Sequence, residues 1–297
     1  MNASILEKYE FYLRSEKCMQ ERSVKDYLQA AKDIASVLDI EGSLTYKDVN
    51  DLIRSKKETQ GLSQASIYKL SICVRHLFRW LQREQIRPDN PYPFAEWKKP
   101  RPATPKFLTQ EQFLSITDDP GLSHQEMSLL FILWDSGARI GEIEQLIQSN
   151  IDTVKAMVNI PWEISKGHYS HRNVPLTRRC ADLLAVQIGY VQRRGHMKAI
   201  FINAQNEPMT RSGMQKVIAA IGLRQSPIRP LMRLSPHQFR HSFGIRMLEK
   251  GVPETIVQKW LGHQSLSMTS WYINMGEDSS RRIFDMYVEK ECLQKIS

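Results

Sequence analysis

The sequence predicts a mainly α-helical protein with a small antiparallel β-sheet, divided into two domains. Apolar residues recur at helical spacing over residues 4–87, and the period changes to two only between residues 157 and 175. Six of the chain's 14 prolines fall between Pro88 and Pro105. We therefore expect a helical domain at residues 1–87, a proline-rich linker at 88–106, a second domain with the sheet at 107–280, and a C-terminal helix or tail at 281–297.

The composition is that of a soluble globular protein, with 41% hydrophobic and 25% charged residues. A formal net charge of +9 favours a polyanionic partner such as nucleic acid, although a basic enzyme without such a partner also fits. The four cysteines lie far apart and predict neither a disulfide framework nor a zinc site. No apolar signal region or membrane-spanning run is present, so we expect a cytoplasmic protein.

The first domain should contain four helices. They are expected at residues 4–16, from a start signal at Ser23, from a second start signal at Thr45, and at residues 63–87. Four cations recur on the polar face of the last helix: Lys69, Arg75, Arg79 and Arg83. A solvated face and a face that contacts DNA both explain this pattern.

The linker should be extended, because dense prolines block both helical and ladder hydrogen bonds. Its basic residues Lys98, Lys99 and Arg101 are placed to follow a phosphate backbone.

In the second domain, capping boxes begin helices at Thr109 and Ser123, and Gly137 should end the second of these. A short helix at 138–146 precedes three expected strands, at 157–160, 163–165 and 172–175, with Lys166 at the hairpin between the last two. Further helices are expected at 177–194, from Thr210 to 221, from Ser235, from 252 to 261, around Tyr272, and at 281–296.

His237 and Arg240 lie in the first turn of the helix that Ser235 and Pro236 begin. Amide groups and the positive end of a helix favour a phosphate at this position. His237 and His241 are four residues apart, as in a zinc-binding helix. The segment nevertheless lacks the glutamate of that motif and places a cation between the histidines, so we expect no metal.

The motifs in order are Ala-Arg139-x-Gly-Glu142, the hairpin lysine Lys166, His237-x-x-Arg240-His241, Leu-Gly-His263 and Tyr272. Together they resemble the tyrosine recombinase (phage-integrase) family, in its simple two-domain, Xer-like form. The resemblance covers residues 107–275 through these motifs. The four-helix first domain resembles the core-binding domain of this family by its helical pattern alone.

The resemblance implies a role for each motif residue. Tyr272 would attack a DNA phosphodiester and form a 3′-phosphotyrosyl link. Arg139 and Arg240 would bind the non-bridging oxygens, and no cofactor would be needed. Lys166 would protonate the leaving oxygen, while His237 would transfer a proton and His263 would donate to the phosphate. Glu142 would orient the site, or would be an ordinary surface acid of its helix.

The implied protein is a site-specific DNA recombinase whose two domains form a clamp on double-stranded DNA and which assembles as a tetramer on its recombination sites. Integration, excision and resolution stay open, as does a need for accessory proteins. A type IB topoisomerase-like strand transferase and an inactive sequence-specific DNA-binding protein are the alternatives. The C-terminal helix would dock onto a neighbouring protomer or pack on its own domain.

Overall fold

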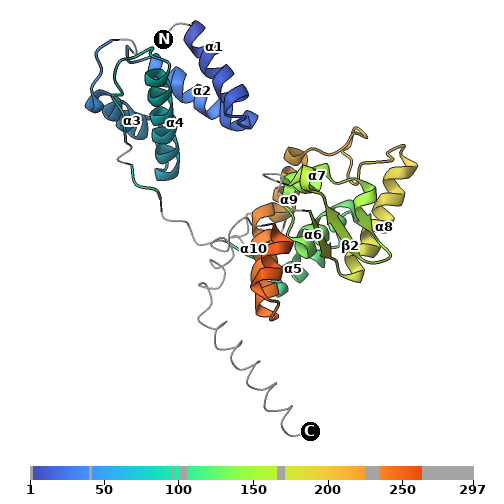
Figure 1. Cartoon of the computed structure of the whole chain (residues 1–297). Helices are drawn as coiled ribbons and strands as arrows, with labels where there is room; N and C mark the ends of the chain where they lie inside the picture. The colour runs from blue at the N-terminus through green and yellow to red at the C-terminus, as the bar shows by residue number, and fades with distance from the viewer. Residues whose placement is uncertain are drawn as a thin grey trace. The chain divides into compact units, whose positions relative to one another are not determined.

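The computed structural model describes residues 3–39, 42–94, 97–100, 106–165, 171–224 and 234–262. The chain divides into two compact units, Met1–Ala103 and Thr104–Ser297 (Figure 1). The fold is mostly helical with one small antiparallel sheet, which confirms the predicted fold class. No helix within the described ranges is long and apolar enough to span a membrane.

The first unit is built from helices that pack around one apolar core. Its elements are α1 (Ala3–Phe11), a π-helical turn (Tyr12–Glu16), α2 (Glu21–Ala35), α3 (Tyr46–Gln60) and α4 (Gln64–Arg83). The long helix α4 packs against α2 and α3 and buries one apolar stripe, which includes Ile67, Val74, Leu77 and Leu81. The opposite face of α4 is left to polar and basic residues, as expected for an amphipathic helix.

The second unit surrounds the apolar helix α6. Its helical elements are α5 (Gln110–Thr117), α6 (His124–Ser136), α7 (Ile140–Gln145), the 3₁₀ turns Gln148–Asn150 and Trp162–Ile164, α8 (Arg178–Arg193), α9 (Arg211–Arg224), α10 (Pro236–Glu249) and α11 (Glu254–Leu261). Helix α6 is buried along its whole second half and packs against α8, α9 and α10. The ring of Trp134 on α6 stacks on Phe113 of α5 with 4.1 Å between centroids.

The sheet has the order β1-β2-β3, with strands Ile151–Asp152, Met157–Ile160 and Arg172–Pro175. In the β2–β3 register, Ile160 pairs with Arg172 and Val158 pairs with Val174. The predicted strands 157–160 and 172–175 are confirmed. The predicted strand at 163–165 is wrong, because Trp162–Ile164 forms a 3₁₀ turn after Pro161. The short strand β1 was not predicted, because two residues carry no readable period.

Most of the expected helix boundaries agree with the structure. Capping boxes begin helices at Thr45, Thr109 and Ser123, and Gly137 takes the left-handed conformation with φ 58°. The expected start at Ser23 is wrong, since α2 already begins at Glu21. The expected helix at 4–16 changes from α to π geometry at Tyr12. The helices expected around Tyr272 and at 281–296 lie outside the described residues.

Candidate active site

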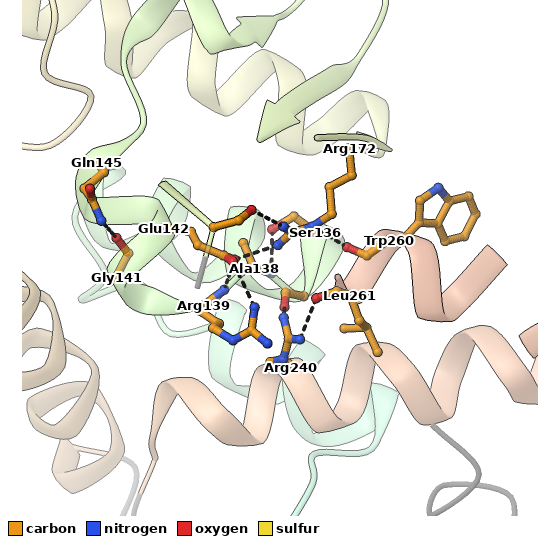
Figure 2. Close-up of polar contacts among 12 residues, drawn as sticks. Ser136, Ala138, Arg139, Gly141, Glu142, Gln145, Arg172, Arg240, Trp260 and Leu261 are labelled. Carbon is orange, nitrogen blue, oxygen red and sulfur yellow. Dashed lines mark hydrogen bonds and ion pairs between the residues drawn. The ribbon is translucent and has the colours of Figure 1, made fainter. Parts of the chain in front are cut away.

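Arg139 and Glu142 form one unit at the start of α7. Arg139 precedes the helix, and its backbone N–H donates to Oε2 of Glu142 at 2.7 Å. Its guanidinium Nη1 donates to Oε1 of the same carboxylate at 3.0 Å (Figure 2). Glu142 is 2% exposed, so it is not the surface acid that one interpretation of the sequence allowed. Its carboxylate holds the Arg139 side chain against the helix end.

Arg240 approaches the same place from the fifth position of α10. Its side chain is buried, with Nη1 donating to the carbonyl of Gly137 at 2.7 Å and Nη2 to that of Leu261 at 2.6 Å. These carbonyls come from the end of α6 and the end of α11. Because a guanidinium is planar, two bonds in different directions fix its plane. A Cβ on Gly137 would lie 2.6 Å from the Phe243 ring, so glycine keeps this turn close to α10.

His237 lies two positions into α10 and remains exposed. Partial desolvation, followed by the positive charges of Arg240, Arg211 and Arg139, lowers the pKa of His237 below its ordinary value. The same causes favour a neutral imidazole at pH 7, able to accept a proton. Burial, together with His237 and Arg240, lowers the pKa of His241 to about 4. Both histidines line a hollow that Lys106 and Leu234 also border.

Two further arginines that were not predicted reach this site. Arg172 on β3 donates from Nη2 to Oε2 of Glu142 at 2.6 Å. The two-residue period of β3 could have predicted the burial of Arg172, because it places Arg172 on the same face as buried Val174. Arg211, at the start of α9, has an exposed side chain that approaches Gly141 of α7 and contributes to the pKa shift of His237. Nothing local in the sequence marks Arg211.

The other predicted site residues fall in two groups. Lys166, His263, Tyr272 and Arg101 lie outside the described residues. The predicted DNA-binding residues of the first unit are described: Lys69, Arg79, Arg83, Lys98 and Lys99 are exposed, and Arg75 is partly exposed. Lys69 bonds Asp26, and Arg83 bonds Glu16 and Glu84.

The arrangement favours a bound anion. Arg139, Arg240 and Arg211 all act electrostatically on His237, and only one carboxylate, that of Glu142, is seen to bond to Arg139 within the described ranges. A group of three or more His, Cys, Asp or Glu side chains that could hold a metal ion is absent from the part of the chain that the structure describes. Guanidinium groups at helix N-termini are well suited to the non-bridging oxygens of a phosphate.

The family profile described as the phage integrase family matches residues 106–278, which is more than half of the chain. The chain belongs to the phage integrase family. The resemblance inferred from the motifs is therefore confirmed, and with it the enzyme class, a tyrosine recombinase that acts in site-specific recombination. All of the described catalytic candidates lie inside the matched segment.

Named relatives of this phage integrase family member align with nearly its whole length. It is 25% identical over 288 residues to the tyrosine recombinase XerC of Bacillus licheniformis, with 92% of each chain covered. It is 26% identical over 301 residues to the tyrosine recombinase XerD of Staphylococcus haemolyticus, with 96% of this chain and 98% of that protein covered. The similarity to Xer proteins thus includes the first unit as well as the second.

Solved structures with the same fold include two integrases. The Tn1549 transposon integrase, in complex with transposon right end DNA, has a TM-score of 0.74 at 18% identity, with 93% of this chain and 97% of that chain covered. A lambda integrase dimer bound to a COC′ core site has a TM-score of 0.70 at 18% identity, with 91% and 76% covered. At this identity, the two structures support the fold of the family member.

Proposed function

We propose that this recombinase cleaves and rejoins double-stranded DNA at specific sites through a covalent 3′-phosphotyrosyl intermediate on Tyr272. The observation that carries the proposal is the fixed pair of guanidinium groups at the starts of α7 and α10. Glu142 holds Arg139, and the carbonyls of Gly137 and Leu261 hold Arg240. Such a pair is oriented before the substrate arrives, which is where electrostatic catalysis gains most.

The reaction would proceed without a change in the number of phosphoester bonds. The Tyr272 oxygen attacks the scissile phosphorus, a new P–O bond to tyrosine forms, and the bond to the 5′-oxygen breaks. Lys166 gives a proton to the leaving 5′-oxygen, while the tyrosine proton passes to a base. A 5′-hydroxyl of the partner strand then attacks the phosphotyrosine and releases Tyr272. The ester keeps the bond energy, so no nucleotide cofactor is consumed.

His237 is proposed to take part in this proton transfer. Its lowered pKa keeps the imidazole neutral near pH 7. It lies in the first turn of α10, three residues before Arg240. Arg139 and Arg240 would stabilise the charge that grows on the non-bridging oxygens, and His263 would donate a further hydrogen bond to them. Glu142 would act through Arg139 and would not touch DNA.

The two units are proposed to clamp one duplex, with the first unit as the core-binding domain. Arg75, Arg79, Lys98, Lys99 and Arg101 would contact backbone phosphates, and a phosphate would replace Asp26 or Glu16 as the partner of Lys69 or Arg83. In solved structures, lambda integrase forms a dimer bound to a COC′ core site and a tetramer bound to a Holliday junction. We propose that this chain also forms a tetramer on two recombination sites and that it acts in the cytoplasm.

The decisive experiment uses a nicked suicide duplex that carries the chain's own recombination site, with the full-length protein and no added metal. We expect a covalent protein–DNA band with the wild type and none with Tyr272→Phe, which should still bind DNA. Tyr190→Phe is a matched control, because this exposed tyrosine lies on α8 and stacks with Arg194. It should form the adduct at the wild-type rate.

The outcomes separate the alternatives. An adduct with Tyr272→Phe would show that the nucleophile is another residue. Relaxation of supercoils without recombinant products would indicate a topoisomerase-like strand transferase, whereas specific binding without any adduct would indicate an inactive DNA-binding protein.

A further inference from the structure

Arg172 is a cation in the interior of the second unit that none of the proposed chemical steps uses. It is the first residue of β3, where it pairs with Ile160 of β2. Its side chain is 0% exposed, so it does not reach a DNA phosphate in this conformation. A buried charge is costly unless each of its donors finds a partner.

The guanidinium of Arg172 reaches three different segments (Figure 2). Nη2 donates to Oε2 of Glu142 at 2.6 Å, Nη1 donates to Oγ of Ser165 at 3.1 Å, and Nε donates to the carbonyl of Trp260 at 2.7 Å. The three acceptors come from α7, from the turn after Trp162–Ile164, and from the end of α11. One rigid group therefore ties together three elements that are far apart in the sequence.

Each of these segments carries a proposed catalytic group. Glu142 holds Arg139 by two hydrogen bonds. Ser165 directly precedes Lys166 in the sequence. Trp260 directly precedes Leu261, whose carbonyl accepts from Arg240, and lies three residues before His263. The three acceptors of Arg172 thus lie one to three residues from Arg139, Lys166 and His263 in the sequence, and one of them adjoins the residue whose carbonyl holds Arg240.

We propose that Arg172 is a positioning residue for DNA cleavage, which sets the relative placement of Arg139, the turn that ends at Ser165 and the end of α11. This inference rests on the proposed function. A buried ion pair adds little to the stability of a fold, because desolvation offsets the attraction. The planar guanidinium instead supplies orientation, since three donors in fixed directions are each used. A lysine at this position would keep the charge but not the three directions.

The charge of Glu142 gives a second, independent readout. Cations face this carboxylate from three places: Arg172 on β3, Arg240 on α10 and Arg139 just before α7. Burial alone would raise the pKa of Glu142, but Arg172 and the other two arginines outweigh it and hold that pKa below its ordinary value. Loss of the Arg172 charge, as in Arg172→Gln, should raise the pKa of Glu142. Glu142 would then become protonated as pH falls and would release Arg139, so cleavage would slow in acid.

The test measures single-turnover adduct formation on the suicide duplex, together with the Kd for intact DNA, across a range of about pH 6 to 8.5. We expect Arg172→Lys to slow adduct formation about 100-fold, because a small displacement of reacting groups is enough for such a loss. The Kd should not change. In Arg172→Gln, which also removes the charge, the rate should fall with decreasing pH more steeply than in the wild type. Ser165→Ala removes a single acceptor and should slow the reaction about tenfold.

Arg246→Lys is the matched control. Arg246 is a partly buried arginine of α10 whose Nη2 donates to the carbonyl of Trp134 at 2.7 Å, and it serves none of the proposed steps. It should cleave at nearly the wild-type rate with the wild-type pH profile. Thermal unfolding of every variant establishes which of them are folded at the assay temperature.

The outcomes are distinct. No adduct with the wild type would refute the proposed function itself. An active wild type, with Arg172→Lys folded and cleaving at the wild-type rate and pH profile, would overturn the positioning role alone. If Arg172→Lys does not fold, Ser165→Ala decides, and its wild-type rate would overturn the role. An equal loss in Arg246→Lys would also count against it, since general destabilisation would then explain the effect.

Discussion

Two sets of basic residues, one in each unit, use the same side chains in opposite ways. On α4 of the first unit, Arg83 is 46% exposed at its side chain and bonds Glu16 and Glu84, which are themselves exposed. In the second unit, Arg240 is 5% exposed and Arg172 is buried, and both bond fixed acceptors. Exposed ion pairs contribute little to stability and exchange partners readily, whereas buried and oriented cations stabilise a negative charge at one position.

Net positive charge and a site that orients cations for one anion are therefore separate properties of this protein. The surface cations supply attraction that depends on salt and on distance. The buried cations depend on their acceptors: Glu142 and the carbonyls of Gly137 and Leu261. Variants of the second unit should therefore change the rate of cleavage, and variants of the first should change the strength of binding.

The largest effect is expected for Arg240→Lys. A lysine cannot bond both the Gly137 and the Leu261 carbonyls and still present a planar pair of donors to a phosphate. Single-turnover cleavage should fall about 1000-fold, while the Kd for DNA changes little. Arg178→Lys is the control, because this exposed arginine bonds the carbonyls of Thr153 and Val154. An unchanged rate in Arg240→Lys would show that Arg240 only links the ends of α6 and α11 and does not contribute to cleavage.

A smaller effect is expected for Glu142→Gln. The amide keeps the shape of the side chain but loses the charge that attracts Arg139 and Arg172, so Arg139 should be less firmly held. Cleavage should slow about 10- to 100-fold, and binding should stay the same. Glu249→Gln, at the exposed end of α10, is the control. Equal losses in both variants would show that the effect is not specific to the site.

Each unit also contains a histidine that should weaken its fold in acid. Burial first, and then Lys17, Arg79 and Arg83, lower the pKa of His76 to about 4, and the pKa of His241 is also about 4. The unfolded chain binds a proton near pH 6.5 and the folded chain does not, so stability falls as pH drops from about 6.5 towards 4.

This pH dependence is measured by urea unfolding at about pH 7 and pH 5. Each histidine should contribute less than about 1.4 kcal/mol per pH unit, and His76→Gln and His241→Gln should each remove part of the dependence. A pH dependence unchanged in both variants would place its origin in other groups.

The smallest effect is expected for Arg79→Ala on α4. Arg79 is exposed, and no carboxylate partner is seen for it within the described ranges. Its removal should lower DNA affinity evenly across sequences and reduce the slope of log K against log salt by about one, without changing the cleavage rate of bound DNA. Arg54→Ala on α3, an exposed arginine paired with Asp51, is the control. Equal slopes for wild type and Arg79→Ala would favour the interpretation of this face as merely solvated.

By itself, the sequence determined the helical class, the short strands 157–160 and 172–175, and the helix starts at Thr45, Thr109 and Ser123. These features follow from local periodicity and capping, which are written in neighbouring residues. It also determined the family, because the order of the motifs can be read without knowing where they lie in the fold. It failed at Trp162–Ile164 and at β1, where segments of two or three residues carry too little pattern to identify them.

Only the tertiary structure decided how the site is held together. It decided that Glu142 is buried and which groups bond Arg240 and Arg172. Except for the short link to Ser165, these hydrogen bonds join residues that are 21 to 103 positions apart in the sequence. Side-chain hydrogen bonds over such separations depend on how helices and strands pack, and packing leaves no local trace in the sequence. The sequence named the groups that would bind the phosphate, and the packing of α6, α7, α10 and α11 fixed their orientation.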